Sequence, residues 1–508
     1  MTLNAPATAP TRPDPGTMLQ WFAQPEEALG PESLGTLQDF LDTLRQSPAS
    51  PQQRHKLLDL IYQRAMALGR ALGPEVSASP LPLGKKMRQQ IRQQQRLLEA
   101  LALDYLADVE NPVDLHLVKG LRQPPEVGLW RMLRCLYLHL LISALAAAPA
   151  GIRIWQTIHR AYRLAQSKGL SRTTPPGETE DIARAYGSTL LLACAQPASY
   201  SGEELAFVAT MTHRLSEDME ILSVADERHH GLFWVDPERD GGPVAMVRRL
   251  PPPETTVLWF SCDRLARQLD AWAEALNAGT RPESLQLPPE AATPTGQGLM
   301  HRLAKSWGHP AKRRFPRRRQ SFRAKLCLGL EQLWLTLEQG EREDSPLSQW
   351  MVTNESPEGY AIMHLAGHTT GLAVGNVVAL KRENGADWEI CLVRWALSEN
   401  PEHLELGLQI LAPRAIPAAF AVPGATQGPT PGALLFPPIP GLRPEEHLLA
   451  PAGALRPDMG MVLLLLQQGH LAVREIGIGR LEEQTGAVET FAIAPYAPAP
   501  ASNGADAG

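Results

Sequence analysis

The sequence predicts a multidomain α+β protein, in which an N-terminal α-helical array precedes a strand-rich second half. Three observations favour this class. Apolar residues recur at helical spacing from about residue 31 to residue 222. Short apolar runs between glycines and prolines dominate after residue 231. At 508 residues the chain is also too long for one core, so several compact units are expected.

The composition is that of a globular protein in a reducing compartment. The formal net charge of −6 argues against a general nucleic-acid or membrane binder, so any such role would be local. The five cysteines lie far apart without a CxxC pair, as buried reduced thiols do. Residues 1–16 do not resemble a signal peptide, and the longest apolar run, Leu136–Gly151, is too short to cross a bilayer. We therefore expect a cytoplasmic protein without a membrane span.

The first half reads as a flexible lead over residues 1–30 and an α-helical domain over residues 31–225. In one segment Leu57, Ile61 and Ala65 recur at the spacing of a helix face, which we expect to end at Gly73-Pro74. Ser201-Gly202-Glu203-Glu204 has the pattern of a capping box that opens a further helix. No strict repeat period is present, so the prediction stops at a helical array.

A small α/β bridging unit and a linker are predicted over residues 226–295. Strand-like runs occur at Gly231–Val235 and Thr255–Phe260, a helix at Cys262–Leu276, and a Pro-rich linker at Thr280–Thr295. The run Asp226–His230 contains two adjacent histidines, which point to opposite faces of a strand, and the chain has no HExxH motif. We therefore predict no metal site here.

A dense basic stretch follows the linker. Between Ala311 and Lys325 the chain has eight basic residues and no acidic one, which calls for a local anionic partner. Most of these residues are arginines, whose planar guanidinium binds phosphate oxygens bidentately, stacks on ring systems and pairs with the O6/N7 edge of guanine. Taken alone, the stretch also fits a solvated basic face or a nucleic-acid patch.

A second motif lies between two strand-like runs, residues 349–353 and residues 360–363. It is Asn354-x-Ser356-x-x-Gly359. Asn and Ser bond locally to backbone or ligand, and Gly permits a close approach of the backbone. By itself this hexapeptide is also consistent with an ordinary hairpin turn.

Together the two motifs resemble the PilZ domain, the bacterial receptor module for cyclic di-GMP. That family has an RxxxR element before its first barrel strand and a [D/N]xSxxG element on a later strand turn. Arg313 and Arg317 match the first element, with Phe315 between them, and Asn354, Ser356 and Gly359 match the second. Two other pairs also satisfy the RxxxR spacing, namely Arg314 with Arg318 and Arg319 with Arg323.

The resemblance covers about residues 311–413 and implies a six-stranded antiparallel β-barrel over residues 300–413. The segment between the two motifs is longer than the family needs, so we expect an insertion within Gly329–Ser345. After the barrel we expect a Pro/Ala/Gly linker at Pro413–Gly432, a β-rich extension over residues 433–495 and a disordered tail over residues 496–508.

The resemblance further implies a cyclic di-GMP-binding effector. Arg313 and Arg317 would clamp the ligand phosphates and guanine faces, and Arg314 and Arg318 would add charge. Asn354 and Ser356 would bond a guanine or phosphate edge, while Gly359 keeps the backbone close. From the domain architecture alone, we further expect the helical domain to engage an unidentified protein partner.

Other functions remain open. The chain has no GxxxxGK[ST] phosphate loop and no GxSxG elbow, so we predict a non-enzyme with no catalytic residue, no metal and no cofactor. One alternative is an interaction scaffold whose PilZ-like domain does not bind nucleotide. The other is nucleic-acid binding through Lys312–Arg323, which we rank last because the second motif is intact.

Overall fold

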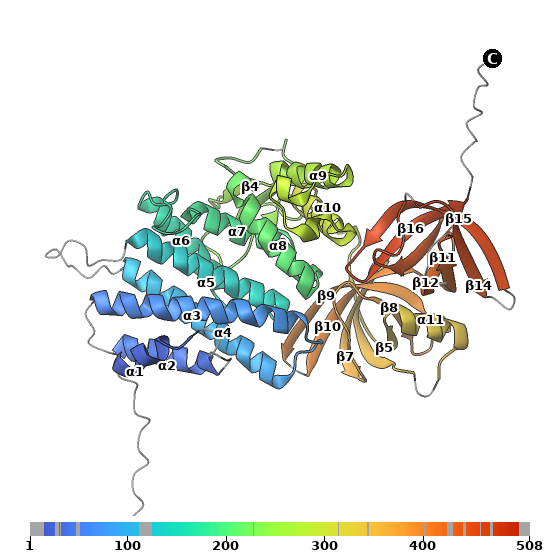
Figure 1. Cartoon of the computed structure of the whole chain (residues 1–508), viewed down its shortest axis with the longest axis horizontal. Helices are drawn as coiled ribbons and strands as arrows, with labels where there is room; N and C mark the ends of the chain where they lie inside the picture. The colour runs from blue at the N-terminus through green and yellow to red at the C-terminus, as the bar shows by residue number, and fades with distance from the viewer. Residues whose placement is uncertain are drawn as a thin grey trace, which may run out of the picture.

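The computed structural model has a helical half at one end and two β-barrels at the other (Figure 1). The structure describes residues 15–25, 30, 32–46, 51–110, 124–226, 228–312, 314–342, 345–400, 402–423, 430–439, 443–457, 459–467 and 471–496. The predicted disordered tail, residues 496–508, lies outside the described residues except for Tyr496. The multidomain α+β class predicted from the sequence is confirmed.

The helical array packs around one continuous apolar core. Its described helices are α1 (Pro15–Phe22), α2 (Ser33–Gln46), α3 (Pro51–Ser77), α4 (Lys85–Glu110), α5 (Pro125–Leu145), α6 (Ile154–Ser167), α7 (Ile182–Cys194) and α8 (Gly202–Leu215). The predicted capping box begins α8, because the Ser201 hydroxyl accepts from the Glu204 backbone N–H and the Glu204 carboxylate accepts from the Ser201 N–H.

Two helices differ from the sequence prediction. The predicted flexible lead contains α1, because Met18 and Phe22 lie four residues apart and bury together, with Phe22 5.7 Å from the Phe40 ring centroid. Helix α3 does not end at Gly73-Pro74 but continues to Ser77. Pro74 lies in the last turn, where a proline removes one backbone hydrogen bond, and the neighbouring Val76 is buried in the core.

The bridging unit shares the core of the helical array. Its antiparallel sheet has the order β1-β4-β2-β3. The elements are β1 (Glu220–Leu222), β2 (Leu232–Val235), β3 (Val244–Ala245), β4 (Leu258–Ser261), α9 (Asp263–Asn277) and α10 (Pro294–Gly308). Trp307 of α10 is fully buried, and its indole N–H donates to the Leu191 carbonyl of α7 at 3.2 Å. The predicted linker at Thr280–Thr295 contains the 3-10 helices η4 (Pro282–Leu285) and η5 (Pro289–Ala292).

The first barrel is closed and antiparallel, with the strand order β10-β7-β6-β5-β8-β9. Its strands are β5 (Arg318–Leu328), β6 (Ser348–Ser356), β7 (Gly359–Ala366), β8 (Val377–Arg382), β9 (Glu389–Asn400) and β10 (His403–Ala412). Trp350 and Ile362 are fully buried in its interior. The predicted insertion is the helix α11 (Leu330–Gln339), which lies between β5 and β6.

The C-terminal β extension is a second closed barrel, with the order β11-β12-β13-β16-β15-β14. Its strands are β11 (Ile416–Ala421), β12 (Thr430–Phe436), β13 (Glu446–Pro451), β14 (Val462–Gln467), β15 (Leu471–Gln484) and β16 (Val488–Pro495). The predicted linker at Pro413–Gly432 therefore contains β11. Ala418 and Phe420, two residues apart, are both buried, so this Pro/Ala-rich segment has the alternation of a strand.

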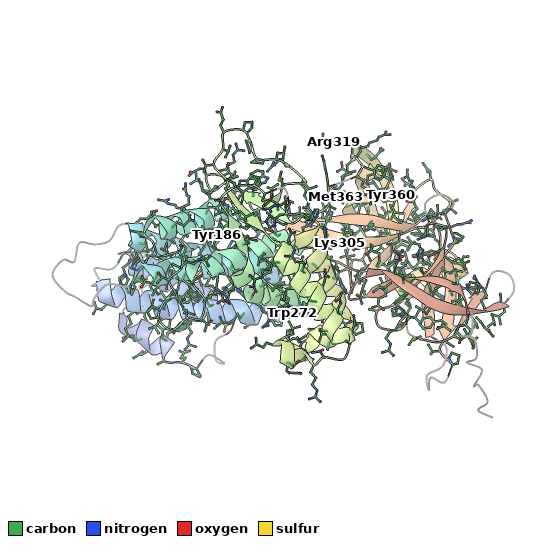
Figure 2. All side chains as sticks on the ribbon, turned by 90° about the horizontal axis from the view of Figure 1, so that it is seen from above. Tyr186, Trp272, Lys305, Arg319, Tyr360 and Met363 are labelled. Atoms are coloured by element: carbon green, nitrogen blue, oxygen red, sulfur yellow. The ribbon has the colours of Figure 1, made fainter. Side chains whose placement is uncertain are left out.

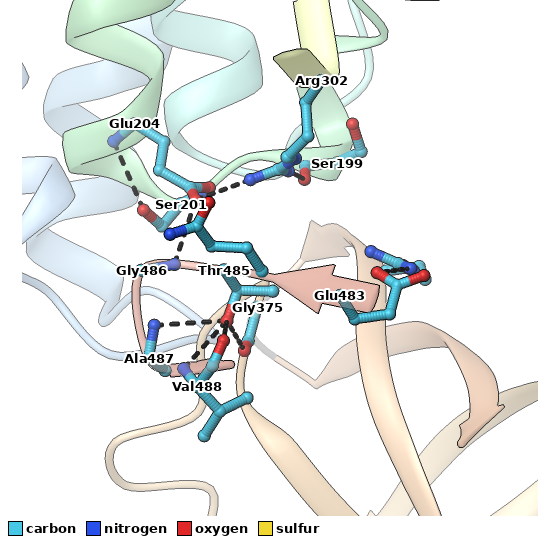
Figure 3. A network of polar contacts seen from close by, with 12 residues as sticks. Ser199, Ser201, Glu204, Arg302, Gly375, Glu483, Thr485, Gly486, Ala487 and Val488 are labelled. Atoms are coloured by element: carbon cyan, nitrogen blue, oxygen red, sulfur yellow. Dashed lines mark hydrogen bonds and ion pairs between the residues drawn. The ribbon is translucent and has the colours of Figure 1, made fainter. Parts of the chain in front are cut away.

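The three units meet at shared contacts. The two barrels and α11 enclose one apolar cluster that includes Leu333, Leu392 and Phe436. Figure 3 shows the polar junction between helices and barrels, where Glu204 pairs with Arg302 of α10 at 2.6 Å and also accepts from the Gly486 N–H at 3.2 Å. The neighbouring Thr485 hydroxyl donates to the Gly375 carbonyl of the first barrel at 2.8 Å. All five cysteines are buried and unbridged.

Candidate functional site

The basic stretch forms the connection from α10 into β5, which we call the arginine loop (residues 312–317). Arg314 and Arg317 of this loop, and Arg318 and Arg319 at the start of β5, are exposed to solvent. Phe315 is 43% exposed, which is unusual for a phenylalanine and leaves an aromatic ring beside these cations. Arg313 lies outside the described residues.

The second motif forms the hairpin turn between β6 and β7, as its turn residues predict. The Ser356 hydroxyl donates to the Gly359 carbonyl at 3.3 Å, which closes the turn. Gly359 lies against β10, where a Cβ atom would come within 1.9 Å of the Leu408 carbonyl oxygen. Only glycine fits at this point, because any side chain would separate two paired strands.

Strand pairing brings the arginine loop and the turn together. β5 runs antiparallel to β6, with Arg318 opposite Glu355 and Arg319 opposite Asn354. Directly opposite residues in such a ladder have Cα atoms about 4.5–5.5 Å apart. The loop therefore enters the barrel beside Asn354, and the predicted residues Arg318 and Asn354 lie at one edge of the barrel. In Figure 2, Arg319 projects from the boundary between the barrels and the helical half.

Arg382, the last residue of β8, also belongs to the site and was not predicted from the sequence. Its guanidinium donates to Glu355 at 2.5 Å and to the Tyr360 hydroxyl at 3.1 Å, and it lies 4.9 Å from the centroid of the Phe322 ring. Tyr360 in turn donates to Glu389 at 2.6 Å. A basic residue at the end of the apolar run Val377–Leu380 is the only sequence signal for this contact.

The pKa shifts in this cluster keep Arg382 charged and Tyr360 neutral. Burial raises the pKa of the Tyr360 hydroxyl, and its hydrogen bond to Glu389 adds to the rise. The hydrogen bond to Tyr360 is the largest cause that raises the pKa of Arg382, and the bond to Glu355 acts in the same direction. Arg382 is therefore a permanent cation beside the turn, and Glu355 is the acidic group that balances it.

The histidine pair of the bridging unit makes protein contacts. The His229 Nδ1 atom lies 2.8 Å from the Ser261 hydroxyl and 3.1 Å from an Asp263 carboxylate oxygen. Among the described residues, no group of three or more His, Cys, Asp or Glu side chains could hold a metal ion.

One described helix, α5, is long and apolar enough to cross a membrane by length and composition. In the structure, 67% of its most apolar window is buried inside the protein. Its buried residues include Leu133, Leu136 and Ile142, which belong to the core of the helical array. Protein packing therefore accounts for the apolar character of α5.

The fold and this site define a PilZ-domain protein: a closed barrel, an arginine loop before its first strand and an Asn-x-Ser-x-x-Gly turn. Residues 16–226 match the family model of the N-terminal domain of the cyclic-di-GMP receptor FimW. Residues 232–339 and 335–417 match that of its middle PilZ domain, so the resemblance seen in the sequence is confirmed. The cyclic-di-GMP receptor FimW of Pseudomonas aeruginosa is 23% identical over 451 residues, covering 72% of this chain and 71% of that protein.

Proposed function

We propose that this chain is a cytoplasmic effector that binds cyclic di-GMP between the arginine loop and the Asn354–Gly359 turn. The pairing of Arg319 with Asn354 carries the proposal, because it places the cationic loop directly beside the turn. The match to the FimW receptor domains supports the choice of ligand. The proposal assigns no catalytic step to the chain.

The site chemistry suits a ligand with two phosphates and two guanine bases. Arg317, with Arg313 and Arg314, would supply guanidinium groups to the phosphates and to the guanine faces. Asn354 and Ser356 would bond a guanine or phosphate edge from the turn. Exposed arginines of like charge repel one another, so a dianion between them and the turn would order the loop.

We further propose that the helical domain transmits ligand binding to a protein partner. The barrel is joined to the array at a buried contact, where the Ser398 N–H of β9 donates to the Ala147 carbonyl at 2.8 Å. Arg88 of α4 binds the same serine through its side chain. A conformational change in the barrel would therefore be transmitted through these contacts to helix α4 and to the end of helix α5.

Isothermal titration of the full chain with cyclic di-GMP tests the nucleotide proposal. Arg317→Ala should weaken binding by about 1.5–3 kcal/mol, which is roughly ten- to more than a hundredfold in Kd. Arg342→Ala is the charge-matched control, since Arg342 is exposed and adjoins Glu341, which pairs with Lys325 toward the other end of β5. The control variant should bind like the unmodified chain.

Two other results would support different functions. No heat with the unmodified chain would reject nucleotide binding and favour the interaction scaffold. Binding of single-stranded nucleic acid that falls steeply with salt and does not change in Asn354→Ala would favour the nucleic-acid function. Unchanged affinity in Arg317→Ala would remove the arginine loop from the site.

A further inference from the structure

The chain reaches the arginine loop by passing along the bridging unit. Helix α10 ends at Gly308, and the His309 ring lies 5.7 Å from the ring of His230, two residues before β2. Gly231 is in such close contact with this segment that a Cβ atom there would be 2.2 Å from the Trp307 carbonyl oxygen. Residues 307–309 are therefore fixed against the sheet of the bridging unit.

Arg248 makes the next contact along this path. Its Nε atom donates to the Ala311 carbonyl at 3.0 Å, directly before the arginine loop. Arg248 lies on the turn after β3, in a segment that we call the bracket turn (residues 246–250). The Met246 N–H donates to the Leu232 carbonyl at 2.9 Å, and the Trp234 indole donates to the Arg249 carbonyl at 2.7 Å. The bracket turn is thus bonded to β2 at both of its ends.

The arginine loop is consequently held at two points. The bond from Arg248 holds Ala311, and the ladder between β5 and β6 holds Arg318 opposite Glu355. Only six residues lie between these two points, so the position of the first point limits where the loop arginines can reach. A loop with both ends fixed also loses less conformational entropy when a ligand orders it.

We propose that Arg248 is a positioning residue of the nucleotide site, which fixes the start of the arginine loop so that the guanidinium groups of Arg314 and Arg317 can reach the Asn354–Gly359 turn. The inference rests on the proposed function and extends the site into the bridging unit. The family match supports a single functional unit, because the middle PilZ domain model covers the bridging unit and the barrel together, from residue 232 to residue 417. Ordering of the loop by nucleotide would then act on the bridging unit through the contact with Arg248. The core of the bridging unit is continuous with that of the helical array.

Arg249 provides a matched control one residue away. It is exposed and carries the same charge, but its guanidinium lies over the Trp234 ring, 5.5 Å from the centroid. A general electrostatic effect on an anionic ligand would appear equally in Arg248→Ala and Arg249→Ala. A positioning effect through Ala311 would appear only in Arg248→Ala.

The test combines titration with limited trypsin digestion of the full chain. With cyclic di-GMP, Arg248→Ala should raise Kd at least fivefold, whereas Arg249→Ala should stay within twofold of the unmodified chain. Arg248→Lys should recover part of the loss, because the lysine ammonium can also donate to the Ala311 carbonyl. Without ligand, mass spectrometry should show faster cleavage between Lys312 and Arg319 in Arg248→Ala than in Arg249→Ala.

The outcomes separate this inference from the proposed function. If the unmodified chain does not bind cyclic di-GMP, the proposed function fails and the inference fails with it. If the unmodified chain binds but Arg248→Ala binds equally well, or if both alanine variants lose affinity equally, only the positioning role is overturned. Equal melting temperatures of the variants would show that neither result comes from misfolding.

Discussion

Arg88 and Ser398 join the helical array to the first barrel across 310 positions of sequence. The Arg88 guanidinium donates to the Ser398 carbonyl at 2.8 Å and to its hydroxyl at 2.6 Å. Arg88 is 6% exposed and Ser398 is fully buried, so water cannot replace this contact. The contact fixes the orientation of the barrel relative to helix α4.

Loss of this contact should destabilise the protein. Arg88→Ala leaves a buried carbonyl and a buried hydroxyl without their charged donor, and we expect the free energy of unfolding to fall by about 2–3 kcal/mol. Urea unfolding measures this change. The control is Arg92→Ala, one turn along α4, where an exposed side chain donates to the Glu399 carbonyl at 3.3 Å. Arg92→Ala should lower the free energy of unfolding by less than about 1 kcal/mol. Equal losses of unfolding free energy in both variants would contradict the view that the buried contact of Arg88 stabilises the protein more than an exposed one.

Gly359 should not tolerate a side chain. In Gly359→Ala the new Cβ would start 1.9 Å from the Leu408 carbonyl, so β7 and β10 must separate. We expect a loss of about 1–3 kcal/mol in stability and weaker cyclic di-GMP binding, since the turn moves with β7. The control is Gly477→Ala in β15, where a Cβ has no neighbour within 4 Å. Thermal unfolding that places both variants at the same melting temperature would refute the steric argument.

Glu355 should weaken the binding of an anion at the turn. Its carboxylate bonds Arg382 at 2.5 Å and accepts from Gln320 at 3.1 Å, which places a negative charge beside the proposed phosphate position. Glu355→Gln keeps the shape and removes the charge, so cyclic di-GMP should bind about two- to tenfold more tightly. Glu446→Gln in the second barrel, where Glu446 pairs with Arg474 at 2.5 Å, should leave affinity unchanged. If titration shows weaker binding in Glu355→Gln, the prediction is wrong, and the ion pair between Glu355 and Arg382 is needed to hold the site in its binding geometry.

His139 should make the helical domain sensitive to acid. Burial lowers the pKa of His139 to about 4 from its ordinary 6.5, and its Nδ1 atom has no hydrogen-bond partner among the described residues. Between these two values the unfolded chain binds more protons than the folded chain, so stability is lost as the pH falls from 6.5 toward 4. At pH 5 the loss from this residue is about 2 kcal/mol.

The measurement for this prediction is the free energy of unfolding at pH 7.5 and pH 5. His139→Leu should lose about 2 kcal/mol less than the unmodified chain over this interval. Some acid sensitivity should remain, because burial also lowers the pKa of His159, and burial and the nearby Arg134 lower the pKa of His213 to about 3. Parallel pH profiles for the two proteins would show that His139 does not titrate as expected.

Local chemistry made several features predictable from the sequence. The arginine loop and the Asn354–Gly359 turn are each a short run in which residue types reveal the geometry, and both fall at the ends of strands as expected. The capping box at Ser201 is equally local, because its two hydrogen bonds join residues three apart. The insertion between β5 and β6 was predictable because the segment between the two motifs is longer than the PilZ family needs.

Features that depend on distant pairing were missed. The contact between Arg382 and Glu355 exists because β8 pairs with β5 in the closed barrel, which a local pattern does not specify. The second barrel closes through β11, whose Pro/Ala-rich sequence resembles a linker until Ala418 and Phe420 are seen to be buried. The roles of Arg313, Arg317, Asn354 and Ser356 in ligand binding remain predictions.

The apolar cluster that contains Leu333 and Phe436 determines which fragments of this protein can be studied alone. A truncation after residue 413 would remove Leu434, Phe436, Leu449 and Val488 from that cluster and expose the outer surface of β8, β9 and α11 to water. Such a fragment would aggregate more readily than the full chain, even with its nucleotide motifs intact. For expression, crystallisation or binding assays, the two barrels should therefore be kept together in one polypeptide.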